Sequence, residues 1–144
     1  EIEFERAKAE LRSTGRGELL ARAELVRCAA RVASLELEGC AGFETLRADA
    51  GAEELSYAEY LAGRRARAAT DDALSKLVAA AIRLKTTRIT PAEIAAAVET
   101  ASAEGWRRPL LAWLGVQEKR AEAAGDREAL ERIRRRIALT LGNP

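Results

Sequence analysis

Apolar residues recur at steps of three and four along most of this chain, which is the spacing that places them on one face of an α-helix. Residues 2–12 place Phe4, Ala7 and Leu11 on such a face. A longer apolar stripe follows in the next segment and consists of Ala21, Leu25, Cys28, Val32 and Leu35. No stretch alternates convincingly between apolar and polar residues, so the pattern predicts helices and no β-sheet.

The middle of the chain carries two further helical segments. One starts near Ser56, a favourable N-cap residue, and the other starts at Thr70, which can cap a helix whose first turn holds Asp71 and Asp72. No glycine or proline separates the two segments after Gly63, so the sequence also allows them to fuse into one long helix.

The segment that starts at Thr90 carries the strongest local signal for a helix. Thr90 is the predicted N-cap, Pro91 occupies the first position, and Glu93 completes a capping box. Gly105 then ends the helix, because glycine readily adopts the left-handed conformation found at helix C-termini.

Two more helices complete the predicted fold. Pro109 opens the first at its initial position and Gly125 closes it, while Asp126 caps the last helix, which ends at Gly142. Aromatic residues are only 4% of the chain, and the strong helix formers Ala, Leu, Glu and Arg dominate. We predict an all-α, single-domain bundle of six or seven antiparallel helices that spans residues 1–144.

The two cysteines, Cys28 and Cys40, raise the question of a disulfide. In an unbroken helix they would lie about 18 Å apart, whereas a disulfide requires Cα atoms closer than about 7 Å. A bond therefore requires the chain to reverse near residues 33–34, which Gly39 and Gly42 permit. The sequence leaves two main alternatives open, a disulfide or a pair of reduced core residues, and both place Cys28 in the core.

The chain contains no histidine, which removes much of the common enzyme chemistry. Ser-His-Asp and Cys-His catalysis need an imidazole, and two cysteines cannot complete a zinc site alone. The acidic pairs Glu53–Glu54 and Asp71–Asp72 are interpreted as solvated charges or helix-dipole partners. We therefore predict no catalytic residues, no cofactor, no metal ligands and no enzymatic activity.

Charge and hydropathy narrow the class of partner. The 24 basic and 23 acidic residues give a net charge of +1, which argues against a dedicated nucleic-acid-binding domain. Arginines cluster at residues 64–67 and 132–136, where we interpret them as solvated helix faces. No apolar run reaches the roughly 20 residues of a transmembrane helix. The partner that we predict is a protein or a peptide.

Five side chains are candidates for contact with this partner. Trp106 follows the glycine that ends a helix and stands beside Arg107 and Arg108, and Trp and Arg often carry the binding energy of interfaces. The alternative is that Trp106 packs back on the helix that it has just left. Tyr57 and Tyr60, three residues apart, form a predicted half-exposed edge.

Residues 109–141 place Trp113 and Val116 in one helix, a turn AAGD after it, and Ala129 and Ile133 in the next helix. This pattern resembles a single helical hairpin of the tetratricopeptide family and covers about a quarter of the chain. The resemblance implies a hairpin that helps to line a peptide-binding groove, and it transfers no functional residue. We also interpret Trp113 as a core residue.

These features predict a non-enzymatic interaction or assembly module that holds a peptide or a partner helix. With bridged cysteines, we expect a periplasmic or cell-envelope protein of a bacterium, similar to a lipoprotein that acts as a chaperone or pilot. Because the chain starts at Glu1, we expect a processed or trimmed form, and a lipid anchor on a removed N-terminal part is one alternative. The other interpretation is a cytoplasmic regulator that contacts nucleic acid through surface arginines.

Overall fold

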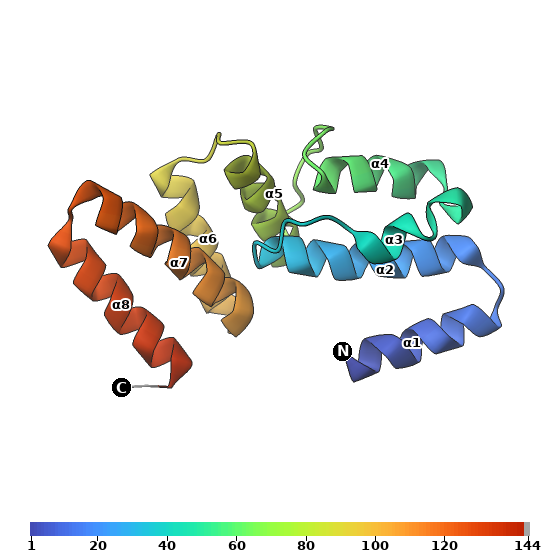
Figure 1. The fold of residues 1–144 in the computed structure, drawn as a ribbon, viewed down its shortest axis with the longest axis horizontal. Helices are drawn as coiled ribbons and strands as arrows, with labels where there is room; N and C mark the ends of the chain where they lie inside the picture. Colours follow the sequence, from blue (N-terminus) through green and yellow to red (C-terminus); the bar gives the residue numbers. More distant parts are fainter. Residues whose placement is uncertain (143–144) are drawn as a thin grey trace. The chain divides into compact units, whose positions relative to one another are not determined.

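The computed structural model of the chain describes residues 1–142, which form helices and no strand (Figure 1). Across this range there are eight α-helices and one 3-10 helix: α1 (Ile2–Ser13), α2 (Gly17–Ala33), α3 (Ala41–Glu44), η1 (Arg47–Asp49), α4 (Ala52–Leu61), α5 (Ala73–Lys85), α6 (Pro91–Glu104), α7 (Arg107–Ala124) and α8 (Arg127–Leu141). The all-α prediction is confirmed. The described chain has more helices than the predicted six or seven because α3 adds a single turn directly after Cys40.

The chain divides into two compact units, and each is described by itself. The N-terminal unit consists of residues 1–32 and 36–68, and the C-terminal unit consists of residues 33–35 and the chain from Ala69 onward. The expectation of a single domain over residues 1–144 stays a prediction.

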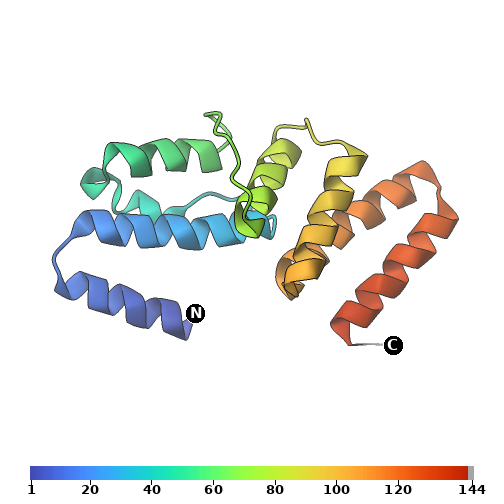
Figure 2. The same ribbon diagram turned by 180° about the vertical axis from the view of Figure 1, so that it is seen from behind.

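In the N-terminal unit, α2 lies between α1 and α4 (Figures 1 and 2). The apolar stripe of α2 is buried through Ala21, Leu25, Cys28 and Val32. Phe43, Tyr60 and Leu61 complete this core from α3 and α4. α1 has no buried residue, and its Phe4 ring lies beside the Arg27 guanidinium of α2, 4.8 Å from the ring centroid. Cation–π contact of this kind helps to hold α1 on α2.

α2 ends at Ala33, where the chain reverses. Leu35 has a left-handed backbone (φ 64°), and the Glu36 N–H donates to the Arg31 carbonyl at 3.0 Å, which is a Schellman-type helix end. Leu35 therefore lies outside the helix, although the sequence placed it on the apolar stripe. The reversal occurs where a bond between the two cysteines requires it.

Two predicted helix starts in the middle of the chain are wrong. α4 begins at Ala52, one turn before Ser56. α5 begins after Asp72, whose carboxylate accepts a hydrogen bond from the Ser75 N–H at 2.9 Å. Thr70 does not cap the helix, because its hydroxyl donates to the Asp72 carboxylate instead.

α4 and α5 also do not fuse into one long helix. Gly63 is left-handed (φ 79°) just after the end of α4, and residues 62–72 contain no helix. The predicted start of the helix at Pro109 is wrong as well, since α7 begins at Arg107 and Pro109 is its third residue. Proline is tolerated there because the first-turn N–H groups have no partner within the helix.

In the C-terminal unit, α6, α7 and α8 each pack on the preceding helix and reverse its direction (Figure 1). Trp113 of α7 is fully buried, as predicted, and donates its indole N–H to the Ala33 carbonyl at 3.1 Å. The capping box of Thr90 and Glu93 is present, and Gly105 ends α6 with a φ of 68°. α5, α6 and α7 supply most of this core, whereas α8 has no fully buried residue.

Candidate functional site

The C-terminal unit contains an open groove of about 500 Å³ that α6, α7 and α8 form together. Its floor is apolar: Ile94 and Leu114 are buried, and Ala129 and Ile133 are half-buried. Ala129 and Ile133 are four residues apart and therefore share one face of α8. Since α8 buries none of its residues completely, its apolar face forms a wall of the groove without closing it.

Three arginines line the same groove, Arg120 on α7 and Arg132 and Arg136 on α8. Arg132 forms an ion pair with Glu128 of its own helix at 3.0 Å. Arg136 pairs with Glu99 of α6 at 2.8 Å and so links the first and last helices of the groove. The basic side chains therefore lie on both α7 and α8.

Arg120 is exposed and has no hydrogen bond or ion pair with any residue in the described chain. The described residues that line the groove include no carboxylate, and Gln117 adds a neutral polar group. The lining thus carries three positive charges in a chain with a net charge of +1. The groove combines an aliphatic floor with a positively charged rim.

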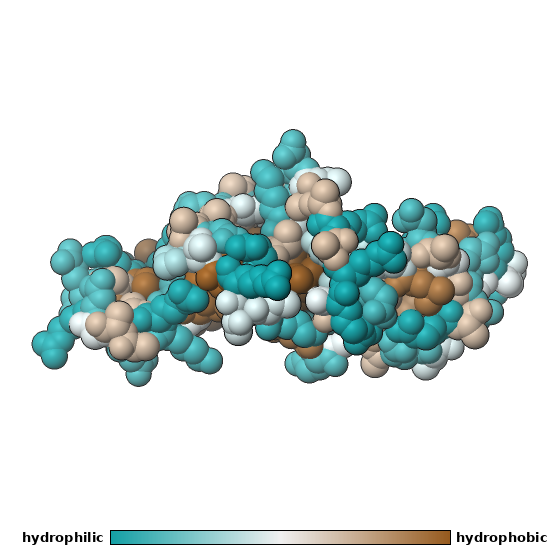
Figure 3. Space-filling view, turned by 90° about the horizontal axis from the view of Figure 1, so that it is seen from above, coloured by the Kyte–Doolittle hydropathy of each residue, from teal (hydrophilic) through white to brown (hydrophobic). Residues whose placement is uncertain are grey.

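Figure 3 shows how apolar surface is distributed on one face of the molecule. Apolar side chains are visible between hydrophilic ones over the α7–α8 end, at the left of the view. The large apolar side chains that are exposed in the described chain are Ile2, Val26, Trp106, Leu139 and Leu141. Two of these, Leu139 and Leu141, lie on α8, which has no fully buried residue.

The N-terminal unit contains a smaller pocket of about 280 Å³ between α2 and α4. The Arg67 guanidinium lies over the Tyr57 ring there, 5.0 Å from its centroid. Glu54 is buried and accepts two hydrogen bonds from Arg22, at 3.2 and 2.9 Å, which hold the pKa of its carboxyl below the usual range. Glu54 lies in the first turn of α4, as expected of a helix-dipole partner, but it is buried and ion-paired rather than solvated.

The two tyrosines that were expected to form a half-exposed edge differ in exposure. Tyr57 is half-buried and lines the smaller pocket, whereas Tyr60 is 7% exposed and belongs to the core. Their ring centroids are 5.9 Å apart. Burial raises the pKa of the Tyr60 hydroxyl, and the charge of Arg67 opposes that shift. The predicted exposure of Tyr60 is wrong, because α4 turns this side chain towards the core.

Trp106 and its two basic neighbours line neither pocket. Trp106 is 36% exposed at the N-cap position of α7, and its backbone N–H donates to the Ala101 carbonyl at 3.0 Å. Arg107 donates from Nη2 to the Leu141 carbonyl at 3.3 Å, and Arg108 is exposed. Their role as contacts for a partner stays a prediction.

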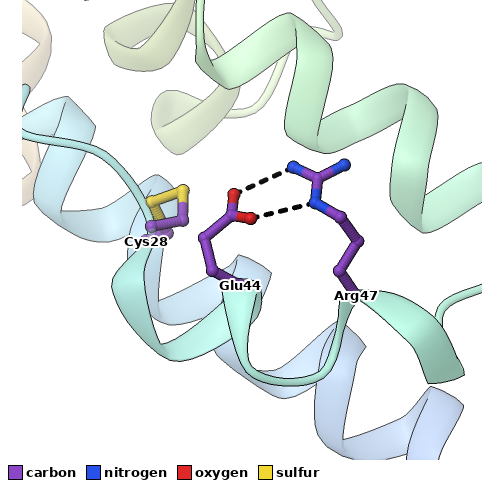
Figure 4. The surroundings of a disulfide bond; sticks show 4 residues. Cys28, Glu44 and Arg47 are labelled. Atoms are coloured by element: carbon purple, nitrogen blue, oxygen red, sulfur yellow. Dashed lines mark hydrogen bonds and ion pairs between the residues drawn. A yellow bond between two sulfur atoms is a disulfide. The ribbon is translucent and has the colours of Figure 1, made fainter.

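Cys28 and Cys40 are joined by a disulfide, with their Cα atoms 5.5 Å apart (Figure 4). The bond links α2 to the residue that precedes α3. Beside it, Glu44 accepts two hydrogen bonds from Arg47, both at 2.9 Å. Of the two alternatives that the sequence leaves open, the structure contains the disulfide.

Residues 1–142 contain neither a candidate metal site nor a candidate membrane-spanning helix. No group of three or more His, Cys, Asp or Glu side chains in this range could hold a metal ion. None of its helices combines the length and the apolar character that crossing a membrane requires.

Comparison with known proteins identifies no relative of this chain. No family model matches the chain, and no match is found among curated proteins or solved structures. The resemblance of residues 109–141 to a tetratricopeptide hairpin therefore stays a prediction.

The three groove arginines do not stand out as a group in the sequence. Arg132 and Arg136 belong to a cluster that the sequence analysis interpreted as a solvated face. Their separation by one helical turn, with Ile133 between them, is the signal that α8 carries a mixed basic and apolar face. Arg120 joins them only because α7 packs on α8, which sequence spacing does not reveal.

Proposed function

We propose that this protein is a non-enzymatic interaction module that binds a peptide or a partner helix in the groove between α6, α7 and α8. The volume of the groove, about 500 Å³, lies within the range of pockets that hold ligands. Amphipathic segments bind in grooves that offer an apolar floor and polar edges. The observation that carries the proposal is the half-buried apolar face that Ala129 and Ile133 present to the groove.

The side chains of the groove support binding rather than catalysis. The described residues that line it include no Ser, Cys, Lys, Asp or Glu, and the chain has no histidine. Nucleophilic and general acid–base catalysis mostly use those side chains. Arginine stays protonated in proteins and therefore does not serve as a base at neutral pH.

A photo-cross-linking amino acid at Gln117 tests this proposal in the cells that make the protein. Gln117 lines the groove, so it should form an adduct with one defined partner that mass spectrometry identifies. The control is the same amino acid at Lys119, which is exposed on α7 and does not line the groove. Equal adducts from both positions would contradict the proposal.

The variant Ala129→Glu is designed to prevent the partner from binding in the groove. A glutamate three residues after the Asp126 N-cap favours helix formation, so the variant should fold while it places a carboxylate among the arginines. The Gln117 adduct should disappear in this variant and persist in Ala95→Glu, which changes an exposed residue of α6 outside the groove. An adduct that Ala129→Glu leaves unchanged would mean that the partner binds elsewhere.

We further propose that the protein works in the bacterial periplasm or cell envelope, as a lipoprotein-like chaperone or pilot. The Cys28–Cys40 disulfide supports this location, because disulfides persist in oxidising compartments and are rare in the cytosol. Protein taken directly from its cells should react with a thiol-alkylating reagent only after reduction. Thiols that are free without reductant would contradict this location.

A cytoplasmic regulator that contacts nucleic acid is the alternative, and internal ion pairs reduce its support. Arg64 pairs with Glu59 at 2.8 Å, and Arg134 pairs with Glu118 at 3.1 Å. Arg67 lies over a tyrosine ring. Glu59 and Glu118 are only 36% and 32% exposed, so water screens these two pairs less and they compete with phosphate groups for the guanidiniums. A labelled DNA duplex should therefore show no salt-sensitive binding, since phosphate contacts weaken steeply with salt.

A further inference from the structure

We propose that the segment held in the groove is acidic as well as apolar. Its aliphatic side chains lie on the floor, and its carboxylates pair with Arg120, Arg132 and Arg136. This inference rests on the proposed function, because it names the chemistry of the partner at the same groove. The occupant is an acidic segment of another protein.

The positive charge of the groove lining is the first support. Three arginines and no acidic residue line the groove among the described residues. Arg120 has no partner in the described chain, so a carboxylate that binds it breaks no internal ion pair. A guanidinium binds a carboxylate through two parallel N–H···O hydrogen bonds, which fixes the geometry as well as the charge.

The other two arginines keep donors available for a ligand. Arg132 donates to Glu128, and Arg136 donates to Glu99, each from Nη1. Each guanidinium has five N–H donors, so most of them remain for a second carboxylate. The side chains of Glu128 and Glu99 are 88% and 68% exposed, and water screens ion pairs at such positions strongly. An incoming acidic segment therefore meets three arginines with unused donors.

The floor favours a peptide over a nucleic acid. Ile94, Leu114, Ala129 and Ile133 are all aliphatic, and the described lining has no aromatic residue on which a base could stack. An aliphatic side chain placed on this floor covers apolar surface that α8 leaves half-exposed. Apolar contact and carboxylate pairing together describe an amphipathic acidic segment.

A random peptide library displayed on phage tests the proposal with the full chain as bait. The decisive variant is Arg120→Gln/Arg132→Gln, which keeps the Arg136–Glu99 pair between α8 and α6. The control is Arg127→Gln, which removes an exposed arginine of α8 outside the groove. The wild type and the control should enrich peptides that combine Asp or Glu with Leu, Ile or Val. The double variant should lose the enrichment for Asp and Glu while its circular dichroism and melting temperature stay unchanged.

A pair of synthetic peptides then separates charge from shape. The most enriched peptide is compared by fluorescence anisotropy with a counterpart in which Gln replaces each Glu and Asn replaces each Asp. The uncharged peptide should bind about tenfold more weakly, as expected for a few exposed ion pairs. The difference should shrink at high salt, because salt screens exposed charges.

Three outcomes would overturn the proposal, and they bear differently on the function proposed above. Equal affinity for both peptides would refute the acidic partner and leave peptide binding in place. Ala129→Glu also serves as a bait with a blocked groove. If the wild type enriches no peptide more strongly than this variant does, the acidic partner is refuted as well. Cross-linking from Gln117 would then decide the proposed function on its own. Salt-sensitive binding of a DNA duplex that depends on Arg120 and Arg132 would refute both.

Discussion

Trp113 donates its indole N–H to the backbone carbonyl of Ala33, which precedes it by 80 residues. The indole is fully buried, and Ala33 is the last residue of α2, just before the left-handed Leu35. Carbonyls at the end of a helix lack partners within the helix, and a buried indole N–H needs an acceptor. The contact satisfies both groups at once.

Trp113→Phe should lower the free energy of unfolding by about 2–3 kcal/mol, because it leaves a cavity and a buried carbonyl without its donor. Urea denaturation followed by circular dichroism measures the change. Trp106→Phe at a 36% exposed position is the control and should cost less than about 0.5 kcal/mol. A larger loss for the Trp106 variant would show that Trp106 is the more important packing residue.

Loss of the disulfide should destabilise the N-terminal unit. The bond joins cysteines 12 residues apart, and closing a loop of that length contributes about 3 kcal/mol through the unfolded chain. Cys28→Ala/Cys40→Ala should show this loss in urea denaturation. Reductant should shift the wild-type midpoint to lower urea and leave the double variant unchanged. A wild-type urea midpoint that stays the same after complete reduction of the disulfide would refute this estimate.

Two glycine substitutions should act in opposite directions. A Cβ on Gly42 would lie 2.6 Å from the carboxyl carbon of Glu24, which is 3% exposed and pairs with Lys8. Gly42→Ala should therefore cost about 1–3 kcal/mol, because the buried carboxylate has to move. Gly115 lies within α7 with no atom near its missing Cβ, so Gly115→Ala should add about 0.5–1 kcal/mol. Thermal and urea unfolding measure the change in the free energy of unfolding for each variant. A change of the same sign in both variants would contradict the predicted clash at Gly42.

Glu54 should make the free energy of unfolding depend on pH in the acidic range. Its pKa is lowered mainly by the hydrogen bonds from Arg22, so its stabilisation is complete above the ordinary pKa of glutamate, about 4.3. That stabilisation is lost as the pH falls through the lower pKa of the folded state. The wild type should therefore be more stable than Glu54→Gln at pH 7, and the difference should close on acidification.

The control for this pH dependence is Glu53→Gln, which removes the neighbouring acid of the same helical turn but no ion pair. Urea unfolding at several pH values measures the free energy of unfolding for the wild type and both variants. A gap between the wild type and Glu54→Gln that stays constant from pH 7 to acid would refute the role of the Arg22 pair.

Helix ends that carry a complete capping motif were predictable from the sequence, and helix ends that depend on tertiary packing were not. The Thr90 capping box and the αL glycine at Gly105 are each complete within a few residues, and both are present. α4 instead starts after Gly51, an N-cap residue with extended backbone, and Ser56, a good N-cap residue, lies inside that helix. Propensity ranks the candidates for a cap, but packing chooses among them.

The candidate site was predictable only in part, for the same reason. The apolar pair Ala129 and Ile133 follows from helical spacing, and the resemblance to a helical hairpin pointed to these residues. Arg120 lines the same groove as Arg132 and Arg136 because of the way α7 packs on α8. A net charge near zero also conceals a local excess of arginine, because it averages over the whole chain.

α8 contributes Ala129, Ile133 and two of the three arginines to the groove, yet it buries no residue completely. A helix with so few buried contacts is among the first parts of a protein to open in local unfolding. The groove ceases to exist when α8 detaches, so a ligand of the groove would bind only the docked helix and, by linkage, would lower the population of the opened state. Hydrogen exchange of the α8 amides would therefore report occupancy directly, as added rigidity of that helix rather than a change of shape.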